Sequence, residues 1–439
     1  MHRIELLDWR KAAFAAVMGL SFLGLIKSLY FPLEAGSYHL DFRVYYCAAR
    51  MVYLDRHAPI YDGALDRIPV DVEAPRQSAI ALRGEADGVP PPVMLYIYPP
   101  LLADLLSPLA RLHYDAAGSA WRALNLVLLY GSLIAVAGLA RIRILSADFA
   151  VLVLAILCFR PMLDTQYLGQ LNIVLFALWA FGILAYDRGR TVLSAALIAL
   201  ATALKVTPLG VVPLFLVWRD RRWLTSYFVA LASLIGAMAI YNGPASLAQF
   251  FTVASAMTGG VPIPENQSIP SLIAWLAFGR TFDHVSVRTI LPFHSPALSL
   301  IIRLAELAFY GSCLLLVSRR RQAKRSERAA VLALFAVIVV LVAPVSWVAS
   351  YTVAFIPLTL EWAGWLHRLG RWSRGILLAG TSVLFQLADS IIWWSQRMKI
   401  PPIVGIVFAA SMILVTAAFC LVGLTAFSQS SRAQLTISD

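Results

Sequence analysis

An aspartate, Asp41, stands directly after the first long apolar segment of the chain. Arg43 follows two positions later, and Tyr45 begins a group of nearby tyrosines. A carboxylate held at the edge of a membrane helix can accept a proton from a hydroxyl group that arrives at the bilayer surface. The alternative is a solvated loop carboxylate. The adjacent arginine and tyrosines fit a short helix lying in the membrane interface, so we expect Asp41 to be catalytic.

A lysine, Lys205, interrupts the otherwise apolar stretch 200–208. An ammonium group at membrane depth is costly unless it faces a cavity, a partner or an anionic ligand, and a lipid phosphate would suit it. Snorkelling to the outer interface is the alternative. Gln170 and Asn172 are predicted at the outer ends of two membrane helices, where their amides can bind sugar hydroxyls or simply cap a helix.

Three further segments carry polar or aromatic groups at predicted outer turns. Tyr98 precedes two prolines that favour a helix start. Asn266 and Gln267 precede an apolar helix, and Trp347 lies in a very short turn. Each has a structural alternative, either as an aromatic residue of the membrane interface or as part of a capped loop.

The composition predicts an integral membrane protein. Of 439 residues, 60% are apolar and only 14% are charged, and apolar runs long enough to cross a bilayer recur along the chain. The net charge of +12 comes from short basic blocks between these runs. Such blocks indicate cytoplasmic loops and argue against nucleic-acid binding. We find no phosphate-binding glycine loop, metal-ligand cluster or Ser-His-Asp arrangement.

We therefore expect one all-α polytopic domain over residues 1–439, with about twelve membrane helices and both termini in the cytoplasm. Two outer loops are long, 33–117 and 242–296, and the first also contains the water-soluble stretch 62–92. The predicted spans are 11–32, 118–140, 147–164, 170–186, 191–206, 207–218, 223–241, 297–317, 329–343, 346–365, 375–394 and 402–426.

Two segments do not fit this assignment of membrane crossings in a simple way. The amphipathic stretch 97–112 would invert every later loop if it crossed, so we place it on the outer interface. The stretch 191–218 must hold two crossings broken at Pro208. Short, broken helices are tolerated where they are buried in protein or line a cavity, so we expect this segment beside the site.

Taken in order, seven motifs resemble glycosyltransferase family 87, a bacterial branch of the GT-C superfamily that includes mycobacterial phosphatidylinositol-mannoside mannosyltransferases. The motifs are Asp41-Phe42-Arg43-Val44-Tyr45-Tyr46, Ile60-Tyr61-Asp62, Tyr98-Pro99-Pro100-Leu101, Gly169-Gln170-Leu171-Asn172, Lys205-Val206-Thr207-Pro208, Asn266-Gln267-Ser268 and Pro344-Val345-Ser346-Trp347. No single motif is specific, but their order covers most of the chain.

The resemblance implies a GT-C enzyme of the bacterial inner membrane whose site faces the periplasm. It would pass a hexose, typically mannose, from a polyprenyl-phosphate carrier to a lipid or glycan hydroxyl, among membrane lipids. By position Asp41 matches the general base. The expected donor- and acceptor-binding residues are Arg43, Tyr45, Asp62, Tyr98, Gln170, Asn172, Lys205, Asn266, Gln267 and Trp347. In relatives a histidine commonly follows the Ser-Trp pair, whereas here residues 348–351 are Val-Ala-Ser-Tyr.

We expect a single inverting displacement in which Lys205 or Arg43 meets the charge of the leaving phosphate. No cofactor is then required; a divalent ion between Asp41 and Asp62 is possible but not favoured. A transporter or flippase for a lipid-linked sugar is the main alternative, but it predicts inverted repeats and polar residues throughout the spans. A polymerase or ligase is a nearer alternative and would use a preassembled glycan, releasing polyprenyl diphosphate.

Overall fold

The computed structural model describes residues 40–62, 78–90, 96–144, 146–256, 266–278, 296–319, 323–363 and 402–429. Within these ranges the regular structure is helical, apart from an isolated β-bridge between Asn266 and Trp347. The predicted all-α class is confirmed for this part of the chain. The predicted spans 11–32 and 375–394 lie outside the described residues.

The helices fall into three consecutive groups. Short helices come first: α2 (Leu40–Leu54), α3 (Ala79–Ala86), α4 (Pro100–Leu106) and the 3₁₀ helix η3 (Leu109–Arg111). The second group is α5 (Tyr114–Ala140), α6 (Ala147–Leu157), α7 (Arg160–Leu168), α8 (Asn172–Asp187), α9 (Thr191–Leu204), η4 (Thr207–Val211), α10 (Val212–Trp218) and α11 (Arg221–Asn242). The third is α12 (Pro244–Ala256), α13 (Ile269–Phe278), α14 (Pro296–Ser318), α15 (Arg325–Leu341), η6 (Val348–Ala354), α16 (Phe355–Trp362) and α18 (Pro402–Gln429).

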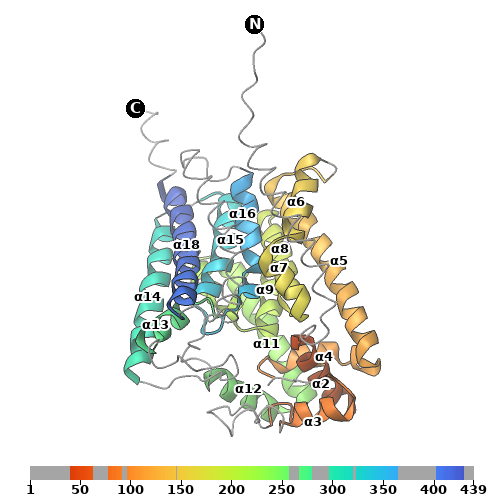
Figure 1. Cartoon of the computed structure of the whole chain (residues 1–439). Helices are drawn as coiled ribbons and strands as arrows, with labels where there is room; N and C mark the ends of the chain where they lie inside the picture. Colours follow the sequence, from red (N-terminus) through yellow and green to blue (C-terminus); the bar gives the residue numbers. More distant parts are fainter. Residues whose placement is uncertain are drawn as a thin grey trace, which may run out of the picture.

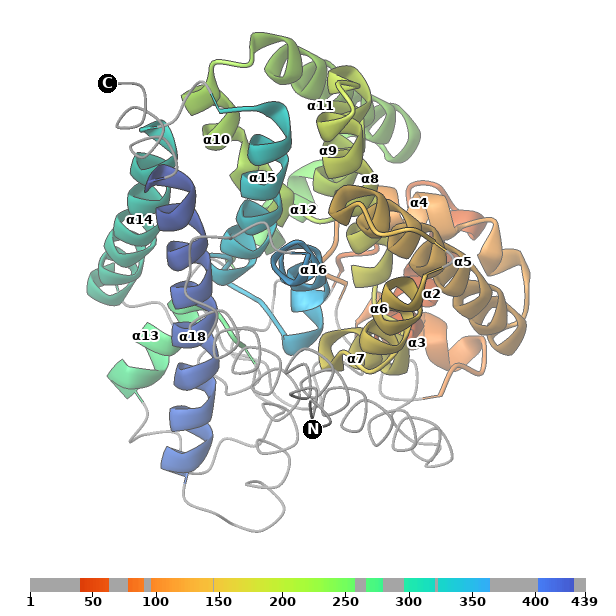
Figure 2. The same ribbon diagram turned by 90° about the horizontal axis from the view of Figure 1, so that it is seen from above.

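The longer helices lie side by side, and α2, α3, α4 and α12 gather at one end of them (Figure 1). Seen along the bundle, α2 to α5 lie on one side and α14 and α18 on the other, with α15 and α16 between them (Figure 2). The largest apolar core is formed where α5, α8, α9 and α15 meet. A second core lies under α2 and α4. The helices at the end of the bundle are therefore packed onto it by a core of their own.

Three described helices, α5, α11 and α14, are long and apolar enough to cross a membrane. Several shorter apolar helices, among them α6, α8 and α9, pack between or beside them. Helices long enough to cross a bilayer, with shorter apolar helices packed among them, are typical of a multi-pass membrane protein. The chain has this character in the part that the structure describes.

Three predicted spans are not single α-helices. The segment 207–218 begins as the 3₁₀ helix η4 and becomes α-helical at Val212. The segment 147–164 breaks after Leu157, and α7 restarts at Arg160 with Pro161 in its first turn. Proline has no N–H to donate to the preceding turn, so α6 cannot run on through it. Arg160 and Asp164 form an ion pair of 2.8 Å inside α7. The segment 346–365 begins as the buried 3₁₀ helix η6 and becomes α-helical only at Phe355.

The basic loops meet at one end of the bundle. Arg325 lies 5.6 Å from the Tyr186 ring centroid and Arg328 lies 5.5 Å from that of Trp218. The Tyr186 hydroxyl donates to Asp220 at 3.3 Å. These contacts join the α8–α9 and α10–α11 loops to the start of α15. Such clustering is what one cytoplasmic face would require.

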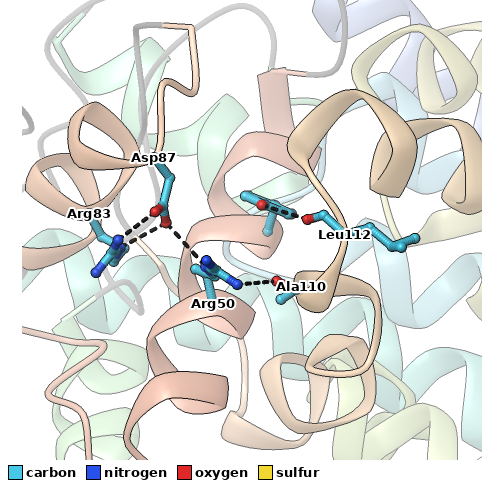
Figure 3. Close-up of polar contacts among 6 residues, drawn as sticks. Arg50, Arg83, Asp87, Ala110 and Leu112 are labelled. Atoms are coloured by element: carbon cyan, nitrogen blue, oxygen red, sulfur yellow. Dashed lines mark hydrogen bonds and ion pairs between the residues drawn. The ribbon is translucent and has the colours of Figure 1, made fainter.

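At the opposite end, an ion-pair network fixes α2 (Figure 3). Asp87 at the end of α3 pairs with Arg83 and, at 3.5 Å, with Arg50 of α2. Arg50 also donates to the Ala110 carbonyl at 2.8 Å. One side chain thus ties α2 to α3 and η3, which limits the freedom of the helix whose first turn contains Asp41.

Candidate active site

Aromatic packing brings the start of α2 against the loop after α7. Phe42 stacks on Trp121 of α5 with ring centroids 5.9 Å apart. The Trp121 indole N–H donates to the Gly169 carbonyl at 3.0 Å. Gly169 ends α7 with φ +69°, a left-handed conformation that glycine adopts without steric cost. Asp41, next to Phe42, is consequently held beside residues 170–172.

The two amides of this loop are buried and bonded to each other. Gln170 and Asn172 are 5% and 4% exposed, and Asn172 Nδ2 donates to Gln170 Oε1 at 2.5 Å. The Gln170 side chain also hydrogen-bonds Asp41. The amides therefore connect the carboxylate of α2 to the first turn of α8.

Lys205 reaches the same place from α9. Its backbone is extended, with φ −154° and ψ 122°, so α9 ends at Leu204 and the chain turns into η4. The ammonium donates to Asn172 Oδ1 at 3.3 Å and to Ser350 Oγ at 3.4 Å. The segment 191–218 therefore breaks at Lys205 and not at Pro208, which lies within η4, and the break lies beside Asn172 and Ser350.

A continuous line of hydrogen bonds now joins Lys205, Asn172, Gln170 and Asp41. Its polarity is determined from both ends, because an ammonium can only donate and a carboxylate can only accept. Each amide must therefore turn its oxygen toward Lys205 and its nitrogen toward Asp41. The two amides therefore lie between the Lys205 ammonium and the Asp41 carboxylate and keep these two charged groups apart.

Burial raises the pKa of Asp41 to about 6, and the Gln170 hydrogen bond and the Lys205 charge act in the opposite direction. The residue as a whole is partly exposed. A carboxylate with a pKa near 6 is a stronger base than an ordinary aspartate and is still ionised at neutral pH. The arrangement suits proton abstraction from a hydroxyl.

Two tyrosines border this carboxylate. The rings of Tyr45 and Tyr98 meet edge to face with centroids 5.0 Å apart. Burial, and after it the charge of Asp41, raise the pKa of Tyr98, which keeps its hydroxyl neutral. The Tyr98 backbone is held in turn, because the Tyr61 hydroxyl donates to its carbonyl at 2.6 Å. Tyr45 and Tyr98 therefore lie close to Asp41.

Asn266 and Gln267 hold the late turn in place. Asn266 Nδ2 donates to the Pro344 carbonyl at 2.9 Å, and Asn266 Oδ1 accepts from Ser346 N at 2.7 Å. Gln267 N donates to the Ser346 carbonyl at 2.6 Å. Both side chains are fully buried, whereas Trp347 is partly exposed. The structure gives the two amides a framework position and leaves Trp347 accessible.

Arg43 and Asp62 are not members of the line of hydrogen bonds. Arg43 is buried on the other side of α2, since residues two apart on a helix do not face each other, and it bonds Tyr114 of α5. Asp62 is exposed on the first outer loop. Of the two predicted cations, Lys205 is the one beside Asp41. Within the described ranges, no three His, Cys, Asp or Glu side chains converge as a metal site would require.

Sequence reasoning missed Ser350 as a site residue. It lies in η6, where Thr352 Oγ1 also donates to the Asn172 carbonyl at 3.4 Å and Thr165 Oγ1 donates to the Ala349 carbonyl at 3.2 Å. The polar run Ser350-Tyr351-Thr352 inside a predicted membrane span was the available signal. Ser350 stands three positions after Trp347, in the region where the family resemblance led us to expect a histidine.

Comparison with known protein families matches residues 96–344 to glycosyltransferase family 87. The match includes Tyr98, the two loop amides and Lys205, and it excludes Asp41 and Trp347. A search of curated proteins found no match. Because the family covers more than half of the chain, the protein belongs to glycosyltransferase family 87.

Proposed function

We propose that this membrane glycosyltransferase moves a hexose, with mannose the first candidate, from a polyprenyl-phosphate carrier to a hydroxyl of a lipid or glycan acceptor. The observation that carries the proposal is the line from Lys205 to Asp41. Transfer from a sugar phosphate needs a base for the incoming hydroxyl and a cation for the outgoing phosphate. The two ends of the line offer these groups.

In the proposed step, the acceptor hydroxyl oxygen attacks the anomeric carbon while its proton passes to Asp41. The bond between that carbon and the phosphate oxygen breaks, and the phosphate leaves with the electron pair. Attack from the face opposite the phosphate inverts the anomeric configuration. The raised pKa of Asp41 favours proton acceptance, and the hydrogen bond from Gln170 keeps the carboxylate oriented.

Lys205 is proposed to bind the carrier phosphate. An ammonium has three hydrogens, and two of them are directed at Asn172 and Ser350. The third is available for a phosphate oxygen. Because Asn172 and Ser350 are both neutral, the full positive charge remains to stabilise the leaving group.

Tyr98 and Trp347 are proposed to contact sugar rings. Tyr98 lies beside Asp41, and Trp347 is the partly exposed residue of a turn otherwise held by buried amides. Aromatic rings offer apolar faces that suit the C–H face of a pyranose. The site would open to the periplasmic side of a bacterial inner membrane, with the basic end of the bundle in the cytoplasm.

The test is direct transfer. Purified protein in lipid nanodiscs is incubated with radiolabelled polyprenyl-phosphate mannose, polyprenyl-phosphate glucose or nucleotide sugars, together with cell-envelope lipids. The proposal predicts label in the acceptor lipid only with a polyprenyl-phosphate donor, and release of polyprenyl phosphate. Transfer from a nucleotide sugar, or release of polyprenyl diphosphate from a preassembled glycan, would contradict the donor assignment.

A further inference from the structure

Apart from the line of hydrogen bonds, a second polar junction joins the two outer loops. Asn242, the last residue of α11, donates through Nδ2 to Asp104 Oδ2 of α4 at 2.7 Å. His57 Nδ1 lies 3.2 Å from the Asn242 carbonyl, and since that oxygen can only accept, the ring nitrogen is the donor. The next residue, Gly243, has φ +83°, and a Cβ there would meet the His57 ring at 3.4 Å. The junction is closely fitted.

The contact between Asp104 and Asn242 leaves one oxygen unsatisfied on each partner. Asp104 Oδ1 and Asn242 Oδ1 are both buried, and neither accepts a hydrogen bond from a described residue. Buried acceptors without a donor destabilise the folded protein. Reversing the Asn242 amide would not help, because Asp104 Oδ2 would then lose its donor and face an oxygen instead.

One proton can satisfy both oxygens. A carboxylic acid and a primary amide form a cyclic pair in which the acid O–H donates to the amide oxygen while the amide N–H donates to the acid oxygen. We propose that Asp104 and Asn242 form such a proton-bridged clamp between the two outer loops, with the proton carried on Asp104 Oδ1. The clamp makes Asp104 a positioning residue, distinct from the groups that would contact substrate.

The surroundings of Asp104 favour the neutral acid. Burial raises its pKa to about 6, and the Asn242 hydrogen bond acts in the opposite direction. The elements packed against α4 are α2, α9, α11 and α12. Neither α9 nor α12 contains a titratable residue.

The charged groups of α2 have other partners. Asp41 bonds Gln170, Arg43 bonds Tyr114, and Arg50 pairs with Asp87. On α11, Tyr241 stacks under Arg56, with the guanidinium 4.8 Å from the ring centroid. The groups that feel the Asp104 charge are the tyrosines Tyr61 and Tyr96, whose pKa values it helps to raise. Among the described residues, His57 is the titratable group that contacts Asn242, and it bonds the backbone carbonyl and not the amide side chain.

The clamp lies between two parts of the proposed site. The helix α4 follows the Tyr98 turn directly, and Tyr96 binds this helix by accepting from Ala103 N at 3.1 Å. On the other side, Asn242 leads through α12 into the second outer loop. Loss of the proton would leave Asp104 Oδ1 and Asn242 Oδ1 without their shared hydrogen bond, and the contact between the two outer loops would weaken. Outer-loop packing should therefore weaken as pH rises through about 6.

The test uses infrared difference spectroscopy on the full-length protein in nanodiscs, which needs no substrate and does not depend on the proposed function. A protonated carboxylic acid has its own carbonyl band, separate from ionised carboxylates and from amides. We expect Asp104→Asn to remove one such band that the unchanged protein shows at pH 5 and loses by pH 7. Asparagine keeps both hydrogen bonds to Asn242, so this variant should fold. The control Asp115→Asn alters an outer-face aspartate whose side chain is 88% exposed and should leave the band in place.

A second variant, Asn242→Leu, keeps the proposal testable if Asp104→Asn does not fold. Asn242→Leu removes the amide, so the acid band of Asp104 should shift to higher frequency as its O–H loses an acceptor. Thermal unfolding gives an independent measurement. The midpoint temperature of unfolding should decrease as the pH is raised from 4 to 7 in the unchanged protein, and it should decrease less in Asp104→Asn. An acid band unaffected by both substitutions would overturn the proposal, as would an unchanged pH dependence of unfolding in Asp104→Asn.

Discussion

Lys205 donates to the Asn172 side chain at 3.3 Å, and this single contact joins the break after α9 to the first turn of α8. Through Asn172 and Gln170 the contact extends to Asp41 in another part of the chain. The polarity of this line assigns separate tasks to its two ends. Each task can be tested by substitution.

Lys205→Ala should raise the KM for a polyprenyl-phosphate sugar more than it changes the KM for the acceptor. The reason is that the phosphate loses its cation both in the bound state and as it departs. A charge-assisted contact of this kind is worth about 1.5–3 kcal/mol, or roughly 10- to 150-fold in kcat/KM. Steady-state kinetics with each substrate varied in turn would measure it.

Two variants sharpen that result. Lys205→Arg keeps the charge and should recover part of the donor affinity. Lys324→Ala removes an exposed lysine at the basic end of the bundle and should have no effect on either KM. Unchanged donor kinetics in Lys205→Ala, with the protein still folded, would make Lys205 a framework residue.

The activity should depend on the ionisation of Asp41. Only the carboxylate can act as the base, and its pKa is about 6, so kcat/KM should fall about tenfold per pH unit below pH 6 and level off above it. Gln170→Met removes the hydrogen bond that stabilises the carboxylate, which should move the acid limb of the profile to higher pH. An acid limb that stays in place would indicate a different titrating group.

Asn266→Ala should destabilise the fold without a specific effect on either substrate. It removes the partners of the Pro344 carbonyl and the Ser346 N–H in a buried turn. Each orphaned group costs about 1–3 kcal/mol, visible as a lower thermal unfolding midpoint. Thr252→Ala on the exposed face of α12 should shift the midpoint by very little. Equal midpoints for the two variants would contradict the framework role of Asn266.

The sequence was a good guide where length and apolarity decide the structure. The predicted spans 170–186, 223–241 and 297–317 differ from α8, α11 and α14 by one or two residues at each end. The break before α7 was missed, although Pro161, which cannot continue a helix, was a local signal for it. The 3₁₀ form of η6 left no comparable signal.

The contacts of the site depend on distant packing. Sequence patterns singled out Asp41, Lys205 and the loop amides, since charges and amides are unusual beside apolar spans. They did not reveal that Arg43 points toward Tyr114, or that Ser350 approaches Lys205 across 145 residues. Such contacts follow from how helices cross, which no local pattern encodes.

The orientation of the bundle predicts where added cysteines react. The four native cysteines are buried, so background labelling should be low. Glu85→Cys and Ala248→Cys place an exposed thiol on α3 and α12, and Lys324→Cys places one at the basic end. A membrane-impermeant thiol reagent should label the first two in cells with a permeabilised outer layer, and the third only after lysis. Labelling of Lys324→Cys without lysis would reverse the proposed orientation.

The most direct test of the account is the turnover number of Asp41→Asn. Asparagine can still accept the Gln170 hydrogen bond but cannot take a proton, so kcat should fall by about 10² to 10⁴ while the unfolding midpoint and the donor KM change little. The control Asp62→Asn, an exposed aspartate of the same outer loop, should retain activity. An Asp41→Asn variant that keeps most of its transferase activity would contradict the assignment of Asp41 as the base.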